Sequence, residues 1–510
     1  MIVKVISSTI IGIDSHPVHV EVDISNGLPQ FSTVGLPDAS VKESKDRIRA
    51  AIKNSGYSFP ADRVTVNLSP ADIRKEGTGF DLPIAAGILA AEEIIRKDSI
   101  LDYMIIGELS LDGTITGVHG ALSAGIQASK MGIKGIIVPK ENAFETSMVR
   151  DIDVIAVDAL SDVVEFFSGR KRIEPVRTNV EKIFSQRIAY PFDFNEIHGQ
   201  EQAKRAMEVA AAGGHNILMI GPPGSGKTML AQRLPTIMPD LSFDEAIEIT
   251  KIFSVGGLLN RTEAIIGTRP FRTPHHTISD VGIVGGGHVP KPGEISLAHH
   301  GVLFLDELPE FRKNVLEVMR QPLENGQVTI TRSCISATYP ARFMLVAAMN
   351  PCPCGYYGDS RRGCRCSVRQ IRRYRTKISG PLLDRIDIHI DVPSVKYKDF
   401  MGKPSGETSA DIKLRVERAR AVQKKRFSAE AACNARMSGR QIKEFCRLDA
   451  EGQNLVEMAM DKLGLSGRGV TRILKVARTI ADLDGTEGIL SSHVAEAIQY
   501  RSLDRKISSC

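Results

Sequence analysis

The hydrophobic positions in the first third of the chain recur with two spacings, one typical of strands and one typical of helices. Val18–Ile24 and Arg63–Leu68 alternate apolar and polar residues, which is typical of strands with one buried face. Ser40–Asn54 has the spacing of an amphipathic helix, and the Ala- and Ile-rich segment Asp81–Ile95 predicts a second helix. We therefore expect residues 1–168 to form an α/β domain.

The middle of the chain contains continuous apolar runs instead. Ile217–Ile220, Gly301–Leu305 and Phe343–Met349 are apolar throughout, as are parallel strands that are buried on both faces. Strands that alternate with helical segments predict a parallel, doubly wound sheet, and we assign it to residues 191–395.

The remaining segments differ in character. Residues 169–190 are polar and basic and are expected to be a linker. Charged residues in such a segment more often lie on a solvated surface than form a binding site. Residues 396–510 are expected to form a small helical lid domain. Its predicted helices are Asp411–Phe427, Gly469–Leu483 and Ser492–Arg501.

Bulk composition narrows the class of protein. A chain of 510 residues predicts about three domains, and a net charge of +6 says little about partners. No stretch reaches eighteen uncharged apolar residues, and the N-terminus lacks the pattern of a secretion signal. We therefore expect a cytoplasmic protein without a membrane span, in which eight cysteines serve as thiols or metal ligands.

A glycine-rich motif follows the first of the central apolar runs and precedes a helical segment. This order of strand, turn and helix is the context that a phosphate-binding P-loop requires. Its backbone N–H groups would hold phosphate oxygens, its lysine would reach the β- and γ-phosphates, and its threonine would bind Mg²⁺. The alternative is a chance glycine-rich turn. The motif is Gly221-Pro222-Pro223-Gly224-Ser225-Gly226-Lys227-Thr228.

Two carboxylates end the apolar run at Gly301–Leu305. Asp306 is placed to organise Mg²⁺, and Glu307 to polarise the attacking water as a general base. Ligands of open α/β sheets bind at the carboxyl ends of the strands, which is where both residues are expected. Together with the P-loop, the pair predicts ATP hydrolysis.

Two further segments, Phe271–Thr277 and Asn350–Gly355, are more specific than a P-loop. With these motifs in order, the chain resembles, over essentially its whole length, the AAA+ ATPases of the magnesium-chelatase-like ComM (YifB) family. The resemblance implies a Lon-protease-like (ribosomal S5 domain 2-like) N-terminal domain, a AAA+ core with helix-2 and pre-sensor-1 insertions, and a helical lid.

The resemblance also implies a function. The family acts as a homo-hexameric ring that uses ATP and Mg²⁺ for helicase action and branch migration on single- and double-stranded DNA. It does so in homologous recombination, notably in natural transformation, so recombination proteins are expected partners. Contacts to the DNA backbone carry no sequence information, so no sequence preference is expected.

Individual roles follow from the same resemblance. Asn350 corresponds to sensor 1, Arg385 to an arginine finger that acts on a neighbouring subunit, and Arg472 to sensor 2. Arg468 is the second candidate for sensor 2. For Arg385 the alternative is a structural arginine paired with an aspartate of its own turn, and the two candidates are Asp384 and Asp387. Ile197 and Gly199, ahead of the P-loop, complete the expected nucleotide-binding set.

A Lon-like domain raises the question of proteolysis, which needs a nucleophilic Ser and a Lys of depressed pKa. The position that matches the nucleophile is Gly79, and the segment expected to hold the Lys reads Val118–Ser123. Thr78 and Ser123 remain as candidates if the alignment slips. We expect a domain without the catalytic dyad, which binds DNA or shapes the ring.

Four cysteines form two closely spaced pairs, Cys352/Cys354 and Cys364/Cys366. Four thiolates suit a closed tetrahedral zinc site, although the single-residue spacing is tighter than usual. The polar loop between the pairs cannot order itself by packing, and a metal would supply that order. Four free thiols are the alternative. The isolated cysteines are expected to be packing or surface residues, and they are Cys334, Cys433, Cys446 and Cys510.

Basic residues concentrate around this cluster. The segment from Arg361 to Arg375 contains seven arginines, and three tyrosines lie in or near it, which suggests phosphate contacts and base stacking. A solvated surface or a subunit contact is the alternative. The loop from Arg269 to His300 is also basic and is expected to contact DNA. Its five histidines suggest a metal site, but no carboxylate lies at ligand spacing.

Three functions remain in view: a DNA motor, a chelatase-type ATPase that remodels a protein or inserts a metal, and an ATP-dependent protease. An integrin-like domain or an acidic linker would favour a chelatase, and the chain shows neither. The arginine-rich segment and the basic loop favour the DNA motor.

Overall fold

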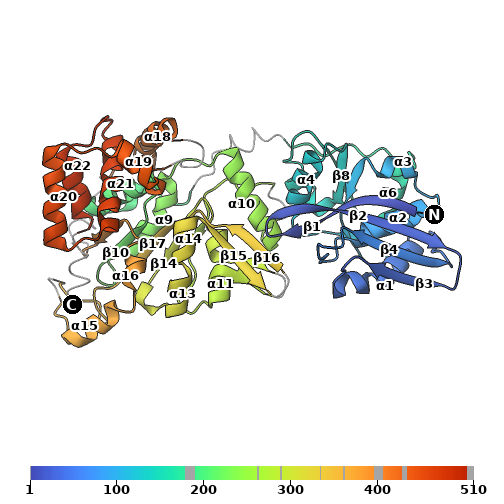
Figure 1. Cartoon of the computed structure of the whole chain (residues 1–510), viewed down its shortest axis with the longest axis horizontal. Coiled ribbons are helices and arrows are strands. Elements are labelled where there is room, and N and C mark those ends of the chain that lie inside the picture. Colours follow the sequence, from blue (N-terminus) through green and yellow to red (C-terminus); the bar gives the residue numbers. More distant parts are fainter. Residues whose placement is uncertain are drawn as a thin grey trace.

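The computed structural model describes residues 2–178, 190–260, 264–287, 290–332, 335–359, 362–394, 406–427 and 433–501. The molecule is elongated: an N-terminal sheet lies at one end, a parallel sheet in the middle and a group of helices at the other end (Figure 1). Among the described residues, no helix is long and apolar enough to cross a membrane.

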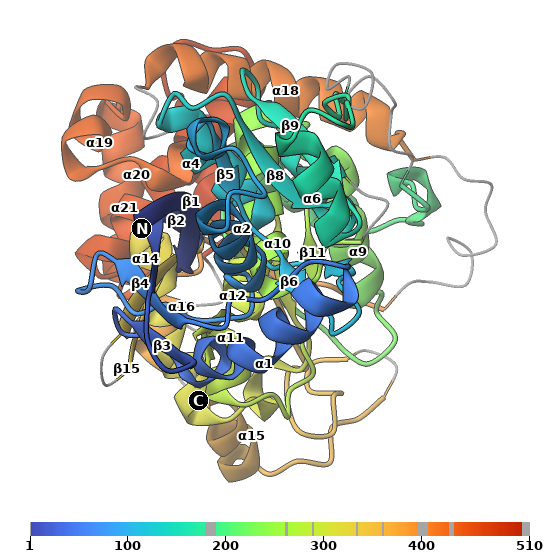
Figure 2. The same ribbon diagram turned by 90° about the vertical axis from the view of Figure 1, so that its right-hand side faces the viewer.

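The N-terminal part is a seven-stranded mixed sheet with the order β3-β4-β2-β1-β5-β8-β9. Pairs β1/β2 and β2/β4 are antiparallel, whereas β3/β4, β1/β5, β5/β8 and β8/β9 are parallel. Figure 2 views the molecule from this end. The strands are β1 (Ile2–Ile11), β2 (Asp14–Ser25), β3 (Gln30–Val34), β4 (Arg63–Ser69), β5 (Tyr103–Ile105), β8 (Gly135–Pro139) and β9 (Asp153–Val157), with a small hairpin of β6 (Glu108–Leu109) and β7 (Ile115–Thr116).

Helices pack on this sheet as the sequence pattern predicts. Val18, Val20 and Val22 of β2 are fully buried on one face, and the polar residues between them are more exposed. The predicted helix at 81–95 is shorter in the structure: α2 ends at Ala91, and Glu93 has a left-handed backbone (φ 62°) that a helix cannot continue through. The helices are α1 (Ala39–Asn54), α2 (Asp81–Ala91), α3 (Lys97–Ile100), α4 (Ala121–Lys130), α5 (Ala143–Thr146) and α6 (Leu160–Phe167).

The central sheet is parallel throughout, in the order β11-β14-β17-β10-β18. Alternate residues of its strands enter two different cores, which explains why β10, β14 and β17 are apolar at every position. Ile217 and Met219 face one core, and Leu218 and Ile220 face the other. The strands are β10 (Ile217–Ile220), β11 (Phe271–Arg272), β14 (Val302–Leu305), β17 (Met344–Met349) and β18 (Ile388–Asp391).

Helices and two hairpins surround this sheet. Helix α10 packs against α4, through a cluster that includes Leu122 and Ile249, and joins the N-terminal part to the central part. The turn at Gly12 lies against the second hairpin, because a side chain there would meet the Thr338 carbonyl at 2.9 Å. The elements are α8 (Glu201–Gly213), α9 (Lys227–Ile237), α10 (Phe243–Gly256), α11 (Asp280–Val284), α12 (Glu294–Leu297), α13 (Lys313–Val318), α14 (Arg320–Asn325), α15 (Val368–Arg375) and α16 (Gly380–Leu383), with the hairpins β12/β13 (Gly285–Gly286, Lys291–Pro292) and β15/β16 (Gln327–Arg332, Ile335–Pro340).

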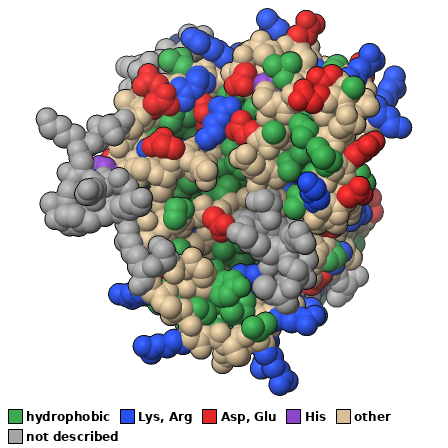
Figure 3. Space-filling model, turned by 90° about the vertical axis from the view of Figure 1, so that its left-hand side faces the viewer, with side chains coloured by type: hydrophobic (Ala, Val, Ile, Leu, Met, Phe, Trp, Pro, Cys, Tyr) green, Lys and Arg blue, Asp and Glu red, His purple; other side chains and the backbone are tan. Residues whose placement is uncertain are grey.

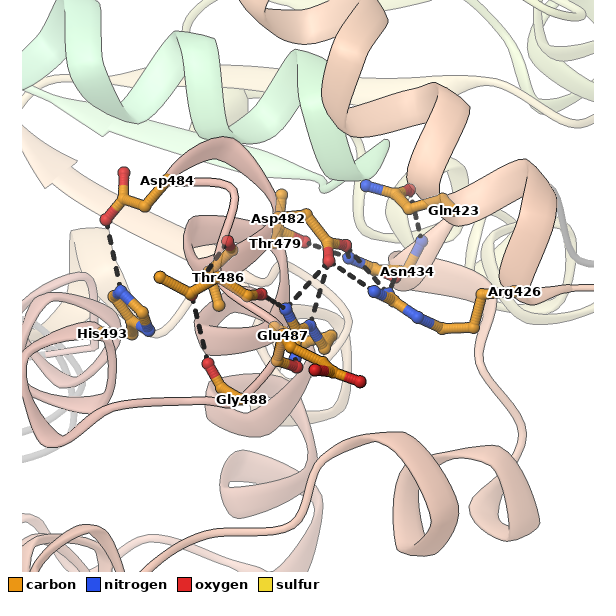
Figure 4. Close-up of polar contacts among 12 residues, drawn as sticks. Gln423, Arg426, Asn434, Thr479, Asp482, Asp484, Thr486, Glu487, Gly488 and His493 are labelled. Carbon is orange, nitrogen blue, oxygen red and sulfur yellow. Dashed lines mark hydrogen bonds and ion pairs between the residues drawn. The ribbon is translucent and has the colours of Figure 1, made fainter.

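The C-terminal helices share the first core with the central sheet, since Val416 and Ile473 lie in the same cluster as Ile217. A buried carboxylate fastens them to one another: Asp482 accepts hydrogen bonds from Arg426 at 2.5 and 2.9 Å and from Asn434 at 2.8 Å (Figure 4). The helices are α18 (Ser409–Arg426), α19 (Gly439–Phe445), α20 (Ala450–Leu463), α21 (Gly467–Leu483) and α22 (Ser491–Gln499).

The α/β prediction is therefore confirmed for the N-terminal and central parts, and the prediction of a parallel central sheet is also confirmed. The three predicted C-terminal helices are present as α18, α21 and α22, within two residues of their predicted bounds. Helices α19 and α20 were not predicted. Half of the predicted basic linker, residues 179–189, lies outside the described residues.

Candidate nucleotide-binding site

The P-loop connects the buried strand β10 to the N-terminus of α9. Gly224 (φ 75°) and Gly226 (φ 86°) adopt left-handed backbone conformations, which glycine accepts without a Cβ penalty. Gly221 passes so close to the neighbouring strand that a Cβ would meet the Val392 carbonyl at 2.1 Å. These residues shape a turn whose N–H groups and helix terminus suit an anion.

Lys227 is the first residue of α9, and its side chain turns back into the loop. Its ammonium donates to the carbonyls of Gly221 at 2.7 Å and Pro222 at 3.0 Å, and it lies 3.4 Å from Oδ1 of Asn350. Burial lowers the pKa of Lys227, and the charges of Asp306 and Glu307 oppose this effect. The cation thus lies at the junction of the P-loop and two strand ends.

The two acidic residues occupy the end of β14. The Thr228 hydroxyl donates to Oδ2 of Asp306 at 2.9 Å, so the predicted magnesium ligands are in contact. Glu307 has a left-handed backbone (φ 51°), and its N–H donates to Oδ1 of Asp306 at 2.9 Å. This backbone conformation is uncommon for a non-glycine residue. Carboxylate and hydroxyl oxygens are ligands that Mg²⁺ accepts.

Strand β17 lies between β14 and β10 and delivers Asn350 to the same edge. The structure therefore brings together five of the predicted site residues, from three neighbouring strand ends. They are Lys227, Thr228, Asp306, Glu307 and Asn350.

The segment ahead of the P-loop also contributes a contact that the sequence did not predict. Ile197 is buried in the core, and Gly199 has a left-handed backbone (φ 64°). The residue that contacts the loop is their neighbour Gln200, whose side-chain amide donates to the carbonyls of Ser225 at 2.6 Å and Pro393 at 3.2 Å. Sequence reasoning missed Gln200 because nothing in its own pattern indicates the contact.

A histidine also lies beside the candidate general base. Nδ1 of His276 is 3.7 Å from Oε2 of Glu307, and its ring stacks near that of His275, with centroids 4.1 Å apart. The sequence indicated these two histidines only as part of the basic loop at 269–300, considered for DNA contact or a metal site, and not as neighbours of Glu307. The position of His276 relative to β14 is evident only in the folded chain.

Arg385 and Arg472 lie together in a pocket of about 110 Å³, and the P-loop is not part of the lining of that pocket. Arg385 is buried, and its guanidinium contacts Oε1 of Glu324 and the Pro381 carbonyl, each at 2.5 Å. The alternative prediction, pairing with Asp384 or Asp387, was wrong about the partner. Arg468, the second candidate for sensor 2, lines the same pocket.

Asp387 forms an ion pair with Arg472 instead. The two side chains are 2.9 Å apart, and Oδ2 of Asp387 accepts from the Asn216 N–H at 3.1 Å and lies 3.4 Å from Nδ1 of His215. Burial would raise the pKa of Asp387, but Arg472 and His215 outweigh it and hold that pKa well below its usual range. The carboxylate thus ties α21 to the residue that precedes β10.

The cysteine cluster follows directly after Asn350. The Sγ atoms of Cys352, Cys354 and Cys364 are 3.4 to 3.6 Å apart, and that of Cys366 lies within 4.8 Å of each of them. A zinc ion with Zn–S bonds of about 2.3 Å would place tetrahedral sulfurs about 3.8 Å apart, so the four residues fit zinc. Cys433 and Cys446 are buried, as expected, and Cys334 and Cys510 lie outside the described residues.

Electrostatics of the thiols favour a cation. N–H groups of Arg365 and Tyr356 lower the pKa of Cys354 to about 6, which favours its thiolate. At Cys364 the N–H of Cys366 lowers the pKa, but burial and the neighbouring thiols outweigh it and raise the pKa to about 12. A divalent cation would relieve this conflict by stabilising every thiolate together.

The second half of the arginine-rich segment forms α15, which stands out from the lower edge of the molecule in Figure 1. Figure 3 views that end of the molecule, and Lys and Arg side chains project along its lower edge. Arg375 and Tyr374 are buried, so they are not available for the predicted phosphate contact and base stacking. Arg361 lies outside the described residues. The exposed arginines are Arg362, Arg365, Arg369, Arg372 and Arg373.

Two arginines of the loop at 269–300 already have partners within the chain. The Arg269 side chain is 9% exposed and donates to the Pro239 and His300 carbonyls, each at 2.6 Å. Arg272 makes a bidentate pair with Glu294 at 2.6 and 2.7 Å. Both arginines therefore have a structural role.

The same loop meets a carboxylate that the sequence spacing did not predict. Oε2 of Glu248, from α10, lies 2.9 Å from Nε2 of His299 and 2.8 Å from Nε2 of His300. The Arg342 N–H donates to Nδ1 of His299 at 2.9 Å, so the proton of the neutral ring is on Nε2. A metal at Nε2 would require an imidazolate, and we therefore interpret the cluster as hydrogen-bonded. Burial lowers the pKa of His299 to about 4.

The two hydroxyls considered for proteolysis both have other partners. Thr78 donates to the Glu108 carboxylate, and Ser123 donates to the Ile13 carbonyl at 2.7 Å. Lys75 is buried and its ammonium donates to the Pro70 carbonyl. These contacts do not form a Ser–Lys dyad.

Comparison with known proteins follows the same division of the chain. Models of the magnesium chelatase subunit ChlI match residues 20–142 and 193–400, and a model of the ChlI C-terminal region matches residues 406–501. YifB of Escherichia coli K12 is 45% identical over 97% of this chain and 96% of its own length. Competence protein ComM of Haemophilus influenzae is 45% identical over 98% of this chain and 97% of its own length.

A more distant relative is the magnesium-chelatase 38 kDa subunit of Cereibacter sphaeroides, 24% identical over 60% of this chain and 89% of its own length. The magnesium-chelatase-like AAA+ family implies an ATPase, which agrees with the site at the ends of β10, β14 and β17. On this identity and coverage, the chain belongs to the ComM/YifB family of magnesium-chelatase-like AAA+ proteins.

Proposed function

We propose that the protein hydrolyses ATP with Mg²⁺ and uses the energy to move DNA. The observation that carries the hydrolysis step is the meeting of a lysine, a threonine, two carboxylates and an asparagine at three strand ends. Lys227 and the P-loop N–H groups bind the phosphates. Thr228 and Asp306 hold Mg²⁺, which neutralises charge that develops on the phosphates.

The remaining residues act on the attacking water. Glu307 accepts its proton as general base, and Asn350 orients it next to the γ-phosphate. Gln200 fixes the P-loop through Ser225. Ile197 and Gly199 supply backbone and packing on the same side of the nucleotide.

We propose further that the site is completed by a neighbouring copy in a homo-hexameric ring. Arg385 and Arg472 line a pocket of their own, which supports a role for both on the nucleotide of the adjacent subunit. An arginine supplied in this way stabilises charge in the transition state. In this proposal Glu324 holds Arg385 until the neighbour's phosphate competes for it.

DNA is the proposed partner because α15 presents five exposed arginines in and next to one short helix. One relative is named a competence protein, which supports a role in natural transformation and recombination, and recombination proteins are expected partners. Residues 1–168 serve as a Lon-like scaffold without proteolysis, 169–190 as a linker, 191–395 as the motor and 396–510 as the lid. The proposed location is the cytoplasm.

A second candidate function is that of a chelatase-type ATPase subunit, which remodels a protein or metal-insertion partner. The match to models of subunit ChlI favours it. ATPase assays with single- and double-stranded DNA, over a salt series from low to physiological concentration, separate the two functions. If DNA neither binds nor stimulates hydrolysis at any salt concentration, the motor proposal fails.

Two variants test the site itself in a branch-migration assay. Lys227→Ala should abolish nucleotide binding, whereas Glu307→Gln should bind ATP, fail to hydrolyse it and retain a closed ring. Retention of branch migration by either variant would contradict the proposed roles. Mass analysis of Glu307→Gln with ATP reports the ring size directly.

We also propose that the four clustered cysteines hold one structural Zn²⁺. Metal analysis of the purified protein should give about one zinc per chain, and Cys364→Ser should lower that content strongly. Zinc-free protein that folds and binds ATP as the untreated protein does would show four free thiols instead.

A further inference from the structure

We infer that the cysteine loop, which the structure describes at residues 351–359 and 362–366, is a positioning element of the nucleotide site, so that binding of Zn²⁺ by its thiols and binding of ATP by the P-loop strengthen each other. The inference rests on the proposed zinc site and ATP site. Three sets of contacts around the loop carry it.

The first connection is along the chain, because the loop begins directly after Asn350, the residue predicted as sensor 1. Asn350 directly follows strand β17, and Cys352, which is fully buried, follows two residues later. Any metal that fixes Cys352 therefore limits where the Asn350 side chain can point. That side chain already lies 3.4 Å from the ammonium of Lys227.

The second set anchors the loop on α15. The Tyr374 side chain of α15 is buried in the same apolar core as Met349, the last residue of β17. Arg375 donates from Nε to the Pro351 carbonyl at 3.2 Å, and its guanidinium lies 5.3 Å from the ring centroid of Tyr357. These contacts explain why Tyr374 and Arg375 are buried while the other described arginines of the segment are exposed.

The third contact is with the P-loop itself. Gly355 has a left-handed backbone (φ 86°), and a Cβ there would lie 2.5 Å from Cδ and 2.7 Å from Cγ of Pro223. The backbone of the cysteine loop at Gly355 thus packs against the ring of Pro223 in the phosphate-binding turn. Gly358, in the same loop, has a similar backbone (φ 80°) but nothing within 4 Å of its Cβ position.

A thermodynamic consequence follows from these contacts. The loop between the cysteine pairs is mainly polar, so the metal rather than a core supplies its order. Losing the metal releases Pro223 and Asn350 from one side, and ATP must then order them at its own cost. Linkage requires that ATP tighten zinc by the same factor by which zinc tightens ATP.

The test uses the full-length protein and measures binding rather than turnover. Zinc affinity is measured by chelator competition with and without a non-hydrolysable ATP analogue, and analogue affinity is measured with and without zinc. We expect both affinities to change by the same factor, about tenfold. Gly355→Ala should keep stoichiometric zinc but lose the coupling, because its methyl group pushes the loop off Pro223.

Gly358→Ala is the matched control, because it carries the same backbone strain without the contact, and it should couple as the unaltered protein does. Equal coupling in both variants, or analogue affinity independent of zinc, would overturn the inference and leave the zinc proposal intact. Absence of bound zinc in the unaltered protein would overturn both. If Gly355→Ala does not fold, Pro223→Ala removes the contact from the other side and should also lose the coupling.

Discussion

Removal of the buried charge on Asp387 by Asp387→Asn should destabilise the attachment of the C-terminal helices to the central sheet. The carboxylate is 1% exposed and lies 2.9 Å from the guanidinium of Arg472, which is 20% exposed. Removing one partner of a buried ion pair costs about 3–5 kcal/mol. The asparagine can still accept from the Asn216 N–H, and Arg472 reaches some solvent, so we expect about 3 kcal/mol.

A double-mutant cycle with Arg472→Gln separates the pair from simple loss of packing. Each single variant leaves one charge unpaired, whereas Asp387→Asn combined with Arg472→Gln leaves none. The double variant should therefore cost less than the sum of the singles, by about 2 kcal/mol. Urea unfolding at fixed protein concentration, followed by circular dichroism, measures the shift in midpoint.

Asp384→Asn is the control, since this partly exposed residue lies in the same turn, and it should change the free energy of unfolding by no more than about 0.5 kcal/mol. Additive effects of the two single substitutions, within about 0.5 kcal/mol, would refute the ion-pair account.

Three further predictions concern other parts of the molecule. His276→Ala should lower kcat for ATP about tenfold and leave ATP affinity unchanged, because the histidine borders Glu307 and not the P-loop; His275→Ala is the control, and an unchanged kcat contradicts the role. Burial lowers the pKa of His299 to about 4. Between pH 6.5 and 4 the unfolded chain therefore binds a proton that the folded chain does not bind. The free energy of unfolding should fall by about 1.4 kcal/mol for each unit by which the pH is lowered in that window. Urea midpoints at pH 5 and 7 check this, and an identical pH slope in His299→Gln would disprove it. Replacing Arg369, Arg372 and Arg373 by Gln should reduce the slope of log K against log salt for duplex DNA by up to about 2.7, while the same change at the exposed Arg418, Lys424 and Lys425 of α18 should leave that slope unchanged.

The sequence predicted the parts of the site that depend on local pattern. An apolar run, a glycine-rich turn and the start of a helix are consecutive in the chain, so their order alone places Lys227 and Thr228 at the phosphate-binding turn. The same holds for Asp306 and Glu307 at the end of β14. Parallel strands that end at one edge then bring the residues together.

Partners that come from distant segments could not be predicted in this way. Glu324 rather than a neighbouring aspartate pairs with Arg385, and Gln200, which was not among the predicted residues, contacts the P-loop. Glu248 reaches two histidines about fifty residues further on. Spacing along the chain does not indicate these contacts, because side-chain neighbours across helices and strands depend on how the elements pack.

Which side chains are buried also depends on tertiary packing. The arginine-rich segment reads as uniformly basic, yet in the structure Arg375 is buried over Tyr357 while Arg372 and Arg373 are exposed. A helix presents successive residues to different surroundings, so only the packed helix separates structural arginines from those free to meet a phosphate. The sequence by itself therefore determined the chemistry available at the nucleotide site and its order along the chain. Tertiary packing decided which charges are paired, which are exposed and which loop lies against the P-loop, because those depend on distances between segments that the chain order does not set.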